Sequence, residues 1–196
     1  MKSIEYVYYE ILKQYEKKKK KKFTQLQLSK TLNISLSTIN LALKPLRKMY
    51  AIKVMPTCFV LRETSKVLYH WANIRNLQKD IIFQARVSQP PRKIESNLPP
   101  NIIFTAYSGF KFKFKKVPAD YSEVYIYADE TTTQIIKKRL AFSKNEPPNF
   151  FVLKKGKLTE LTASLLFVDL WNLPEWYAKD YLKALKKELI KIGILE

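Results

Sequence analysis

The chain has 196 residues, 46% of them hydrophobic and 13% aromatic, which is enough for one or two folded cores and excludes a disordered protein. Its 36 Lys and Arg against 17 Asp and Glu give a formal net charge of +19, so a polyanion, and first of all nucleic acid, is the expected partner. One cysteine (Cys58), one histidine (His70) and three glycines exclude an internal disulfide, the usual zinc sites, a P-loop and a dinucleotide fingerprint.

The N-terminal region combines an amphipathic helix with a basic run. Residues 2–16 place apolar side chains at three- and four-residue spacings, which predicts a helix with one buried stripe. Lys17–Lys22 is a run of six like charges, which predicts the helix end or a loop rather than core. We interpret the run either as a solvated loop or as an arm in which Lys20, Lys21 and Lys22 contact phosphates.

Two short helices joined by a tight turn are predicted next. Thr24 is suited to cap the first helix, with Gln27 at the capping-box position. Asn33 tolerates the left-handed conformation and is expected to end that helix, after which Ser35 caps the second. Pro45 lies inside the second helix and lacks an amide hydrogen, so we expect a kink or an early helix end there.

A hairpin and a long helix are predicted after this pair. Two β-prone runs, residues 51–54 and 58–61, are separated by three residues, which predicts a hairpin that forms the wing of a winged helix-turn-helix. Between Thr64 and Phe83 apolar residues recur at helical spacing, which predicts one long amphipathic helix. Such a helix could pack on the first helix or pair with a second subunit.

A proline-rich segment marks the expected domain boundary. Residues 88–100 hold four of the ten prolines in a polar setting, which is typical of a semi-rigid connector. We therefore predict an α+β protein with an N-terminal winged helix-turn-helix domain at residues 1–87, a linker at 88–100 and a small mixed α/β domain at 101–196. Residues 1–90 hold 18 basic and 5 acidic side chains (+13) and residues 91–196 hold 18 and 12 (+6), so the first domain should face nucleic acid.

Short apolar runs alternate with helical patterns in the second half. Extended segments are expected at residues 102–107, 110–115, 124–128, 149–153 and 165–170, and helices at 131–142 and 174–192. In the second of these segments phenylalanine and lysine alternate, so a strand would place Phe110, Phe112 and Phe114 on one face. The opposite lysines, Lys111, Lys113 and Lys115, are interpreted either as a solvated face or as an anion-binding strip.

The start of the last helix carries two further signals. Asn172 and Glu175 have capping-box spacing. The aromatic segment Trp171–Tyr177 is interpreted in one of two ways. Its side chains either pack the last strand against the last helix or serve as an anchor for a protein partner. Both interpretations remain open from the sequence.

The pair of helices with its hairpin is the pattern that predicts a function. The N-terminal part of the second helix would enter the major groove, where Asn40 is suited to adenine and Leu36 and Leu41 either touch thymine methyls or pack locally. Basic residues nearby would contact phosphates and set the register. The candidate DNA-binding residues are Ser35, Ser37, Thr38, Asn40, Leu41, Lys44, Lys48, Lys53, Arg62, Lys20, Lys21 and Lys22.

Catalysis has little support in the sequence. His70 has no serine or cysteine nucleophile signature near it. Five carboxylates could in principle hold magnesium but lack the close pairing of a two-metal site. These are Asp120, Glu123, Asp129, Glu130 and Asp169. We therefore expect no enzyme activity, no metal and no cofactor.

Two resemblances to known families follow from these motifs. Residues 23–61 resemble the winged-helix domains of many bacterial and archaeal transcription regulators. Residues Thr105–Phe110, Pro118–Tyr127 and Val168–Trp171 resemble the C-terminal part of AbiEi-type antitoxins from abortive-infection systems. The resemblance implies a repressor of its own operon and a nucleotidyltransferase-like toxin made alongside it.

The antitoxin resemblance also implies an inactive second domain. In that family the second domain itself resembles a nucleotidyltransferase without its active site. Here Ser108 and Gly109 reverse the Gly-Ser order of such enzymes, and Asp120 is not followed by Asp at the second position. Both departures fit a domain without nucleotide-transfer chemistry.

The sequence thus predicts a sequence-specific regulator of transcription that binds double-stranded DNA as a repressor. We expect a homodimer, because one recognition helix reads only a few base pairs. The alternative is an antitoxin-like protein whose second domain binds and neutralises an enzyme partner. No segment approaches the roughly 20 apolar residues of a membrane span and residues 1–10 lack a signal-peptide pattern, so we expect a cytoplasmic protein that does not bind membranes.

Overall fold

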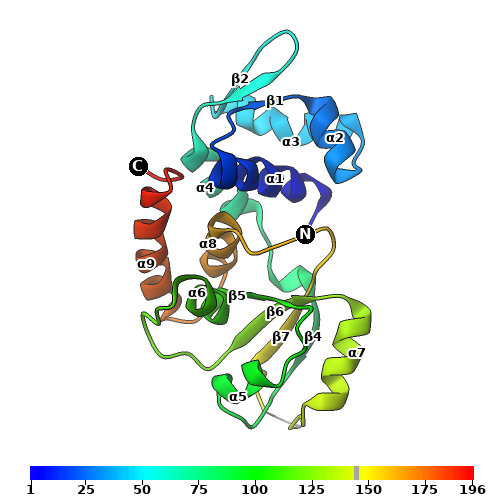
Figure 1. The fold of residues 1–196 in the computed structure, drawn as a ribbon, viewed down its shortest axis with the longest axis vertical. Coiled ribbons are helices and arrows are strands. Elements are labelled where there is room, and N and C mark those ends of the chain that lie inside the picture. Colours follow the sequence, from blue (N-terminus) through cyan, green and yellow to red (C-terminus); the bar gives the residue numbers. More distant parts are fainter. Residues whose placement is uncertain (144–145) are drawn as a thin grey trace. The chain divides into compact units, whose positions relative to one another are not determined.

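The computed structural model describes residues 1–143 and 146–196 and has a mixed α+β fold (Figure 1). Two compact units divide the chain. Unit 1 comprises residues 1–75, 162–168 and 186–196, and unit 2 comprises residues 76–161 and 169–185. No helix among the described residues is long and apolar enough to cross a membrane.

Unit 1 is built from helices and a small sheet. Its first four helices are α1 (Ser3–Lys18), α2 (Gln25–Leu32), α3 (Leu36–Lys48) and α4 (Thr64–Ile74). Strands β1 (Lys22–Phe23), β2 (Ile52–Val54) and β3 (Phe59–Leu61) form an antiparallel sheet in the order β1-β3-β2. The buried side chains that hold these elements together include Val7, Ile11, Phe23, Leu28, Ile39, Leu43, Phe59 and Trp71.

The turn between α2 and α3 forms as the sequence predicts. The side chain of Thr24 caps α2 by accepting from the Gln27 amide at 3.0 Å, and that of Ser35 caps α3 by accepting from the Thr38 amide at 3.3 Å. Asn33 adopts the left-handed conformation at φ 48°. The side chain of Gln27 instead accepts from Lys20 Nζ at 3.1 Å.

The early helix end that was one alternative at Pro45 and the long helix expected over residues 64–83 were both wrong, whereas a kink at Pro45 stays a prediction. The helix α3 continues past Pro45 to Lys48, because Leu43 and Leu46 on its buried face keep it packed. The long helix expected over residues 64–83 ends at Ile74, and a 3-10 turn, η1 (Gln78–Asp80), then leads into strand β4 (Ile81–Ala85). The backbone of β4 pairs with another strand, so sheet formation outweighs the helical spacing of its apolar residues.

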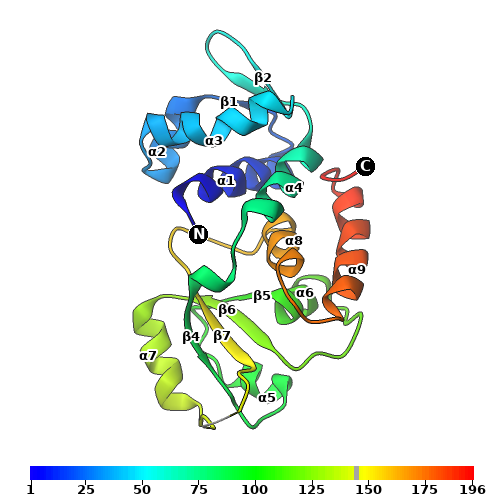
Figure 2. The same ribbon diagram turned by 180° about the vertical axis from the view of Figure 1, so that it is seen from behind.

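Unit 2 is built around a four-stranded sheet in the order β4-β7-β6-β5 (Figure 2). The remaining strands are β5 (Ile103–Thr105), β6 (Val124–Ala128) and β7 (Phe150–Lys154). Strands β6 and β7 are parallel, and the two outer pairs are antiparallel. One face of the sheet packs on Ile94 of α5 (Pro91–Ser96) and on Ile136 of α7 (Glu130–Arg139), while Ile135 of α7 is exposed.

The boundary expected at residues 88–100 lies inside unit 2. This segment contains α5, whose Ile94 is fully buried, and Pro91 occupies the first turn of that helix. Proline is compatible with a helix start because the first amides have no intrahelical acceptor. The proline-rich composition therefore marks a helix start within the unit.

Two segments expected to be strands are helices. Residues 110–115 lie largely in α6 (Ala106–Phe114) and residues 165–170 in α8 (Ala163–Trp171). In α6 the phenylalanines do not share a face, since Phe110 is buried and Phe112 is exposed. Short apolar runs have no period that separates a strand from a buried helix, which explains both errors.

The last helix, α9 (Ala178–Lys191), begins four residues after Pro174. The capping box expected at Asn172 and Glu175 is wrong, because Glu175 instead accepts hydrogen bonds from two tyrosines of unit 2. Within the aromatic segment, Tyr177 is buried and Trp176 is exposed. Helices α8 and α9 each contribute residues to both units.

Candidate nucleic-acid interface

The helix α3 has a buried face and a solvent face. Ile39, Leu43 and Leu46 are fully buried. The solvent face carries the exposed residues Ser37, Asn40, Leu41, Lys44 and Lys48. Leu36 and Leu41 are 49% and 61% exposed, so neither packs into the core.

Three hydroxyl groups meet at the N-terminus of α3. The Ser35 hydroxyl oxygen lies 2.9 Å from those of both Ser37 and Thr38. Because Ser35 also accepts from the Thr38 amide, its oxygen is already used by the cap. The structure thus brings all three predicted hydroxyls together, but Ser37 is the most available of them, since Thr38 is half-buried.

Asn40 has a partner that the sequence reasoning missed. Arg47 Nη2 donates to Oδ1 of Asn40 at 2.6 Å, two helical turns along α3. A guanidinium group only donates, so the contacted amide atom must be the oxygen, and the amine of Asn40 is directed away from Arg47. The seven-residue spacing on one helix could have revealed this pair, because residues two turns apart share a face.

A second set of candidate residues lies on the small sheet. Lys22 of β1 and Lys53 of β2 both pair with Val60 of the central strand β3. Directly paired residues point to the same side of a sheet, so the two lysines flank Val60 on one face. The opposite face carries Phe23 and Phe59, whose rings stack 5.6 Å apart in the core. The outward face of the sheet is therefore basic.

The other predicted cations differ in how exposed their charge is. Arg62 directly follows β3 and is exposed, as is Lys21. The amine of Lys20 is instead held by Gln27 and lies 5.1 Å from the centre of the Phe23 ring. Lys20 is thus less available for a phosphate than Lys21.

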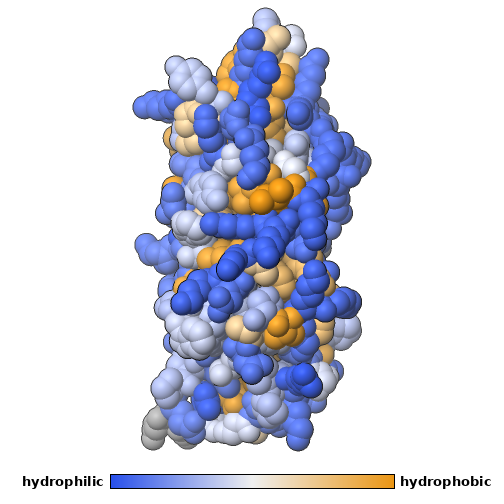
Figure 3. Space-filling model, turned by 90° about the vertical axis from the view of Figure 1, so that its left-hand side faces the viewer, coloured by the Kyte–Doolittle hydropathy of each residue, from blue (hydrophilic) through white to orange (hydrophobic). Residues whose placement is uncertain are grey.

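No acidic residue occurs between Lys17 and Arg62. This stretch includes α2, α3 and the whole small sheet, and it holds twelve basic side chains. Among the candidate DNA-binding residues, six exposed ones form no ion pair with any carboxylate of residues 1–143 and 146–196: Lys21, Lys22, Lys44, Lys48, Lys53 and Arg62. The surface of this region therefore keeps a positive potential that an anionic partner can neutralise. Hydrophilic side chains also cover most of the molecular face drawn in Figure 3.

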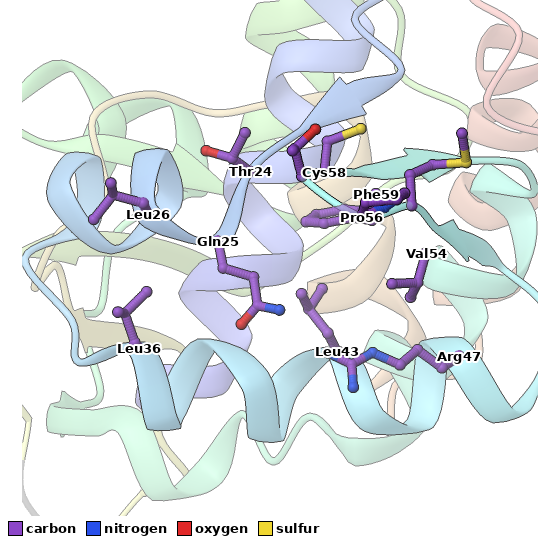
Figure 4. A pocket seen from close by; sticks show the side chains of 12 residues that line it. Thr24, Gln25, Leu26, Leu36, Leu43, Arg47, Val54, Pro56, Cys58 and Phe59 are labelled. Atoms are coloured by element: carbon purple, nitrogen blue, oxygen red, sulfur yellow. The ribbon is translucent and has the colours of Figure 1, made fainter.

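A pocket of about 410 Å³ lies between α2, α3 and the β2–β3 hairpin. Figure 4 shows Leu36, Leu43 and Arg47 of α3 on one side of it and Val54 and Phe59 of the hairpin on the other. Most of its lining is apolar, whereas the solvent face of α3 beside it is mainly polar. The sequence reasoning did not predict this pocket, because its walls come from segments that meet only in the fold.

Most carboxylates weighed as metal ligands have structural hydrogen bonds. Asp169 accepts from Tyr127 and Thr105, and Glu123 accepts from Tyr177. Asp129 caps α7, and the hydrogen bond from the Thr132 amide lowers the pKa of its carboxyl. The described residues contain no cluster of three or more His, Cys, Asp or Glu side chains that could hold a metal ion.

His70 and the remaining acids are also placed by the structure. The His70 ring packs edge-on against Tyr8 at 5.4 Å, and burial lowers the pKa of its imidazole. Asp120 and Glu130 are exposed. Ser108 and Gly109 lie buried in α6.

Comparisons with known proteins give no match for this chain: no family model, no curated protein and no solved structure matches it. The candidate interface therefore rests on its own geometry and charge.

Proposed function

We propose that unit 1 binds double-stranded DNA as a winged helix-turn-helix, with α3 as recognition helix and the β2–β3 hairpin as wing. The observation that carries the proposal is the stretch from Lys17 to Arg62, which holds twelve basic and no acidic side chains. The exposed candidate cations that form no ion pair within the described part of the chain lie on the solvent face of α3 and on or directly beside the small sheet. Such an array suits the regular phosphates of a duplex.

The two kinds of side chain on this surface would have different tasks. Lys44, Lys48 and Lys53 would contact phosphates and set the register of the protein on the duplex. Ser37 and Asn40 near the start of α3 would reach base edges in the major groove. One recognition helix reads only a few base pairs, so we propose a homodimer that acts on transcription as a repressor in the cytoplasm.

Fluorescence anisotropy with labelled duplexes tests the proposal. Selection from a random duplex library would first supply preferred sites, and affinity for these would be compared with affinity for the unselected pool across a salt series. Lys44→Ala should lower the slope of log affinity against log salt by about one, because one phosphate contact is lost. Lys138→Ala in α7 removes the same charge from an exposed site in unit 2 and should leave the slope unchanged.

Two outcomes would contradict this function. If selection enriches no sequence and the pool binds as tightly as any single duplex at about 150 mM salt, specific recognition fails. If Lys44→Ala and Lys138→Ala lower the slope equally, binding reflects net charge rather than the surface of α3.

The apolar pocket beside α3 favours a second candidate function, contact with another protein. Leu36, Val54 and Phe59 offer an apolar lining of the kind that a protein side chain fills. An antitoxin-like role with an enzyme partner would need such a contact in one of the two units. Co-expression with the product of the neighbouring gene, followed by co-purification, tests it; a complex that survives Val54→Asp would exclude the pocket as the contact.

A further inference from the structure

We propose that α3 recognises thymine, through contact between the Leu41 side chain and the C5-methyl group in the major groove. The inference rests on the proposed DNA-binding function and names the base chemistry that this surface would select. Leu41 is 61% exposed, which is more than any other apolar residue of α3. An apolar side chain on the solvent face of a helix contributes a favourable hydrophobic free energy only when a partner buries it.

The surroundings of Leu41 indicate what this partner is. Ser37 lies one helical turn before Leu41, and Lys44 and Lys48 lie one and two turns after it, all on the solvent face. Apart from the half-buried Pro45, which also lies one turn after Leu41, these neighbours of Leu41 are polar or basic. A partner helix would need a continuous apolar stripe, whereas a duplex offers isolated methyl groups among polar base edges and phosphates.

The major groove presents one kind of apolar group. Among the four bases thymine alone carries a methyl group there, and apolar side chains contact it in known recognition. The phosphates on both sides of the groove match the lysines that flank Leu41. The pattern of Leu41 between Ser37 and Lys44 thus fits an A·T pair better than a G·C pair.

Asn40 is compatible with an A·T pair, but it does not distinguish that pair from G·C. Arg47 donates to the amide oxygen of Asn40, which leaves the amide NH2 of Asn40 as the group that can donate to a base. Both edges of an A·T pair offer it an acceptor, N7 of adenine or O4 of thymine. Guanine offers acceptors as well, so the discrimination falls on the methyl contact of Leu41.

Replacing thymine by uracil isolates the methyl group, because uracil keeps the same hydrogen-bonding edge. Wild-type protein would be titrated with alternating A·T and alternating A·U duplexes of equal length. Loss of each methyl contact should weaken binding about fourfold, the value expected for one buried CH₂-sized group. Leu41→Ala should bind both duplexes with equal affinity. Ile190→Ala, which truncates a similarly exposed residue of α9, should keep the wild-type preference.

The outcomes separate this inference from the function on which it rests. Failure to bind either duplex or any selected site would overturn the DNA-binding proposal itself. Equal affinity of the wild type for the A·T and A·U duplexes would overturn thymine recognition and leave DNA binding intact. A preference that survives Leu41→Ala but is lost in Leu36→Ala would overturn the choice of Leu41. Since both leucines are exposed, circular dichroism should show all variants folded.

Discussion

Units 1 and 2 use their polar side chains in opposite ways. In unit 1 the cations of α3 and the small sheet point to solvent without carboxylate partners among the described residues. In unit 2 carboxylates are turned inward and accept hydrogen bonds from tyrosines: Glu175 accepts from Tyr107 and Tyr125, both at 2.9 Å. The difference indicates that these cations of unit 1 contribute little to its fold, whereas these carboxylates of unit 2 hold theirs together; this is what the proposed DNA-binding function would require of unit 1.

Unit 2 also has a fully buried hydrogen-bond cluster around Asp169. Its carboxylate accepts from Thr105 at 2.7 Å and from Tyr127 at 2.8 Å, and all three residues are buried. Such groups are costly to bury unless they are hydrogen-bonded, so their pairing is a condition of the fold. A chemical role for them would require that a substrate displace these bonds.

Unit 1 also has a buried polar site, although a smaller one. Glu5 Oε2 accepts from Trp71 Nε1 at 3.2 Å and lies 3.5 Å from Arg75 Nη1, with both charged side chains almost fully buried. This ion pair joins the start of α1 to the residue that follows α4. A substitution at this ion pair can therefore change the stability of unit 1 while its surface cations stay in place.

The largest expected effect is that of Glu5→Ala. Removing the carboxylate takes its ion pair from the buried Arg75 guanidinium and its hydrogen-bond acceptor from Trp71 Nε1, which should lower the free energy of unfolding by about 3 to 5 kcal/mol. Urea denaturation followed by Trp71 fluorescence, in a background with Trp171→Phe and Trp176→Phe, measures the change. Glu188→Ala removes an exposed pair with Lys191 and should cost under about 1 kcal/mol. Equal effects of the two substitutions would contradict the buried role of Glu5.

The second-largest expected effect is that of alkaline pH, which should lower the free energy of unfolding of unit 2. Burial raises the pKa of Tyr107, Tyr125 and Tyr181, with carboxylates nearby adding to the shift. A raised native pKa leaves stability unchanged below the unfolded value near 10 and lowers it above, where unfolded tyrosines ionise and native ones do not. Ionisation of these three tyrosines in the unfolded chain should lower the free energy of unfolding by about 4 kcal/mol at about pH 11.

Thermal unfolding from about pH 8 to pH 11, with phenolate absorbance as second signal, checks this prediction. Tyr125→Phe removes one ionising group and should make the fall above pH 10 less steep. A melting temperature that stays constant through this range would show that the tyrosines of unit 2 are accessible to water in the native protein.

The smallest effect on stability is expected from the sheet surface of unit 1. Lys22→Ala combined with Lys53→Ala should change the free energy of unfolding by less than about 0.5 kcal/mol, because both side chains are exposed. The same variant should lower the salt slope of DNA binding by about two. Lys138→Ala with Lys179→Ala is a control with the same loss of charge from unit 2. If this variant of unit 1 loses stability but keeps the wild-type salt slope, the two lysines serve the fold and not the binding of DNA, contrary to the comparison of the two units.

Local sequence signals predicted much of unit 1. The caps at Thr24 and Ser35, the left-handed Asn33 and the β2–β3 hairpin all formed where expected. Each depends on hydrogen bonds and dihedral preferences within a few residues, so the neighbouring residues suffice to specify them. Strand β4 did not follow its local pattern, since its pairing with β7 joins segments far apart in the chain.

In the candidate interface, too, some features follow from the local sequence and others depend on the fold. The solvent face of α3, with Ser37, Asn40, Leu41, Lys44 and Lys48, follows from helical spacing alone. The contact of Arg47 with Asn40 depends on side-chain conformations, which spacing permits but does not decide. The pocket beside α3 needs α2 and the hairpin as further walls.

The sequence by itself determined the excess of positive charge, the absence of acids between Lys17 and Arg62, and the capped turn before α3. Only the tertiary structure decided that Lys22 and Lys53 flank Val60, that Leu41 stays exposed and that Tyr127 meets the buried carboxylate of Asp169. The physical reason is the distance along the chain over which each property is determined. Charge and caps are properties of residues and their neighbours, whereas strand register and burial arise when distant segments pack together.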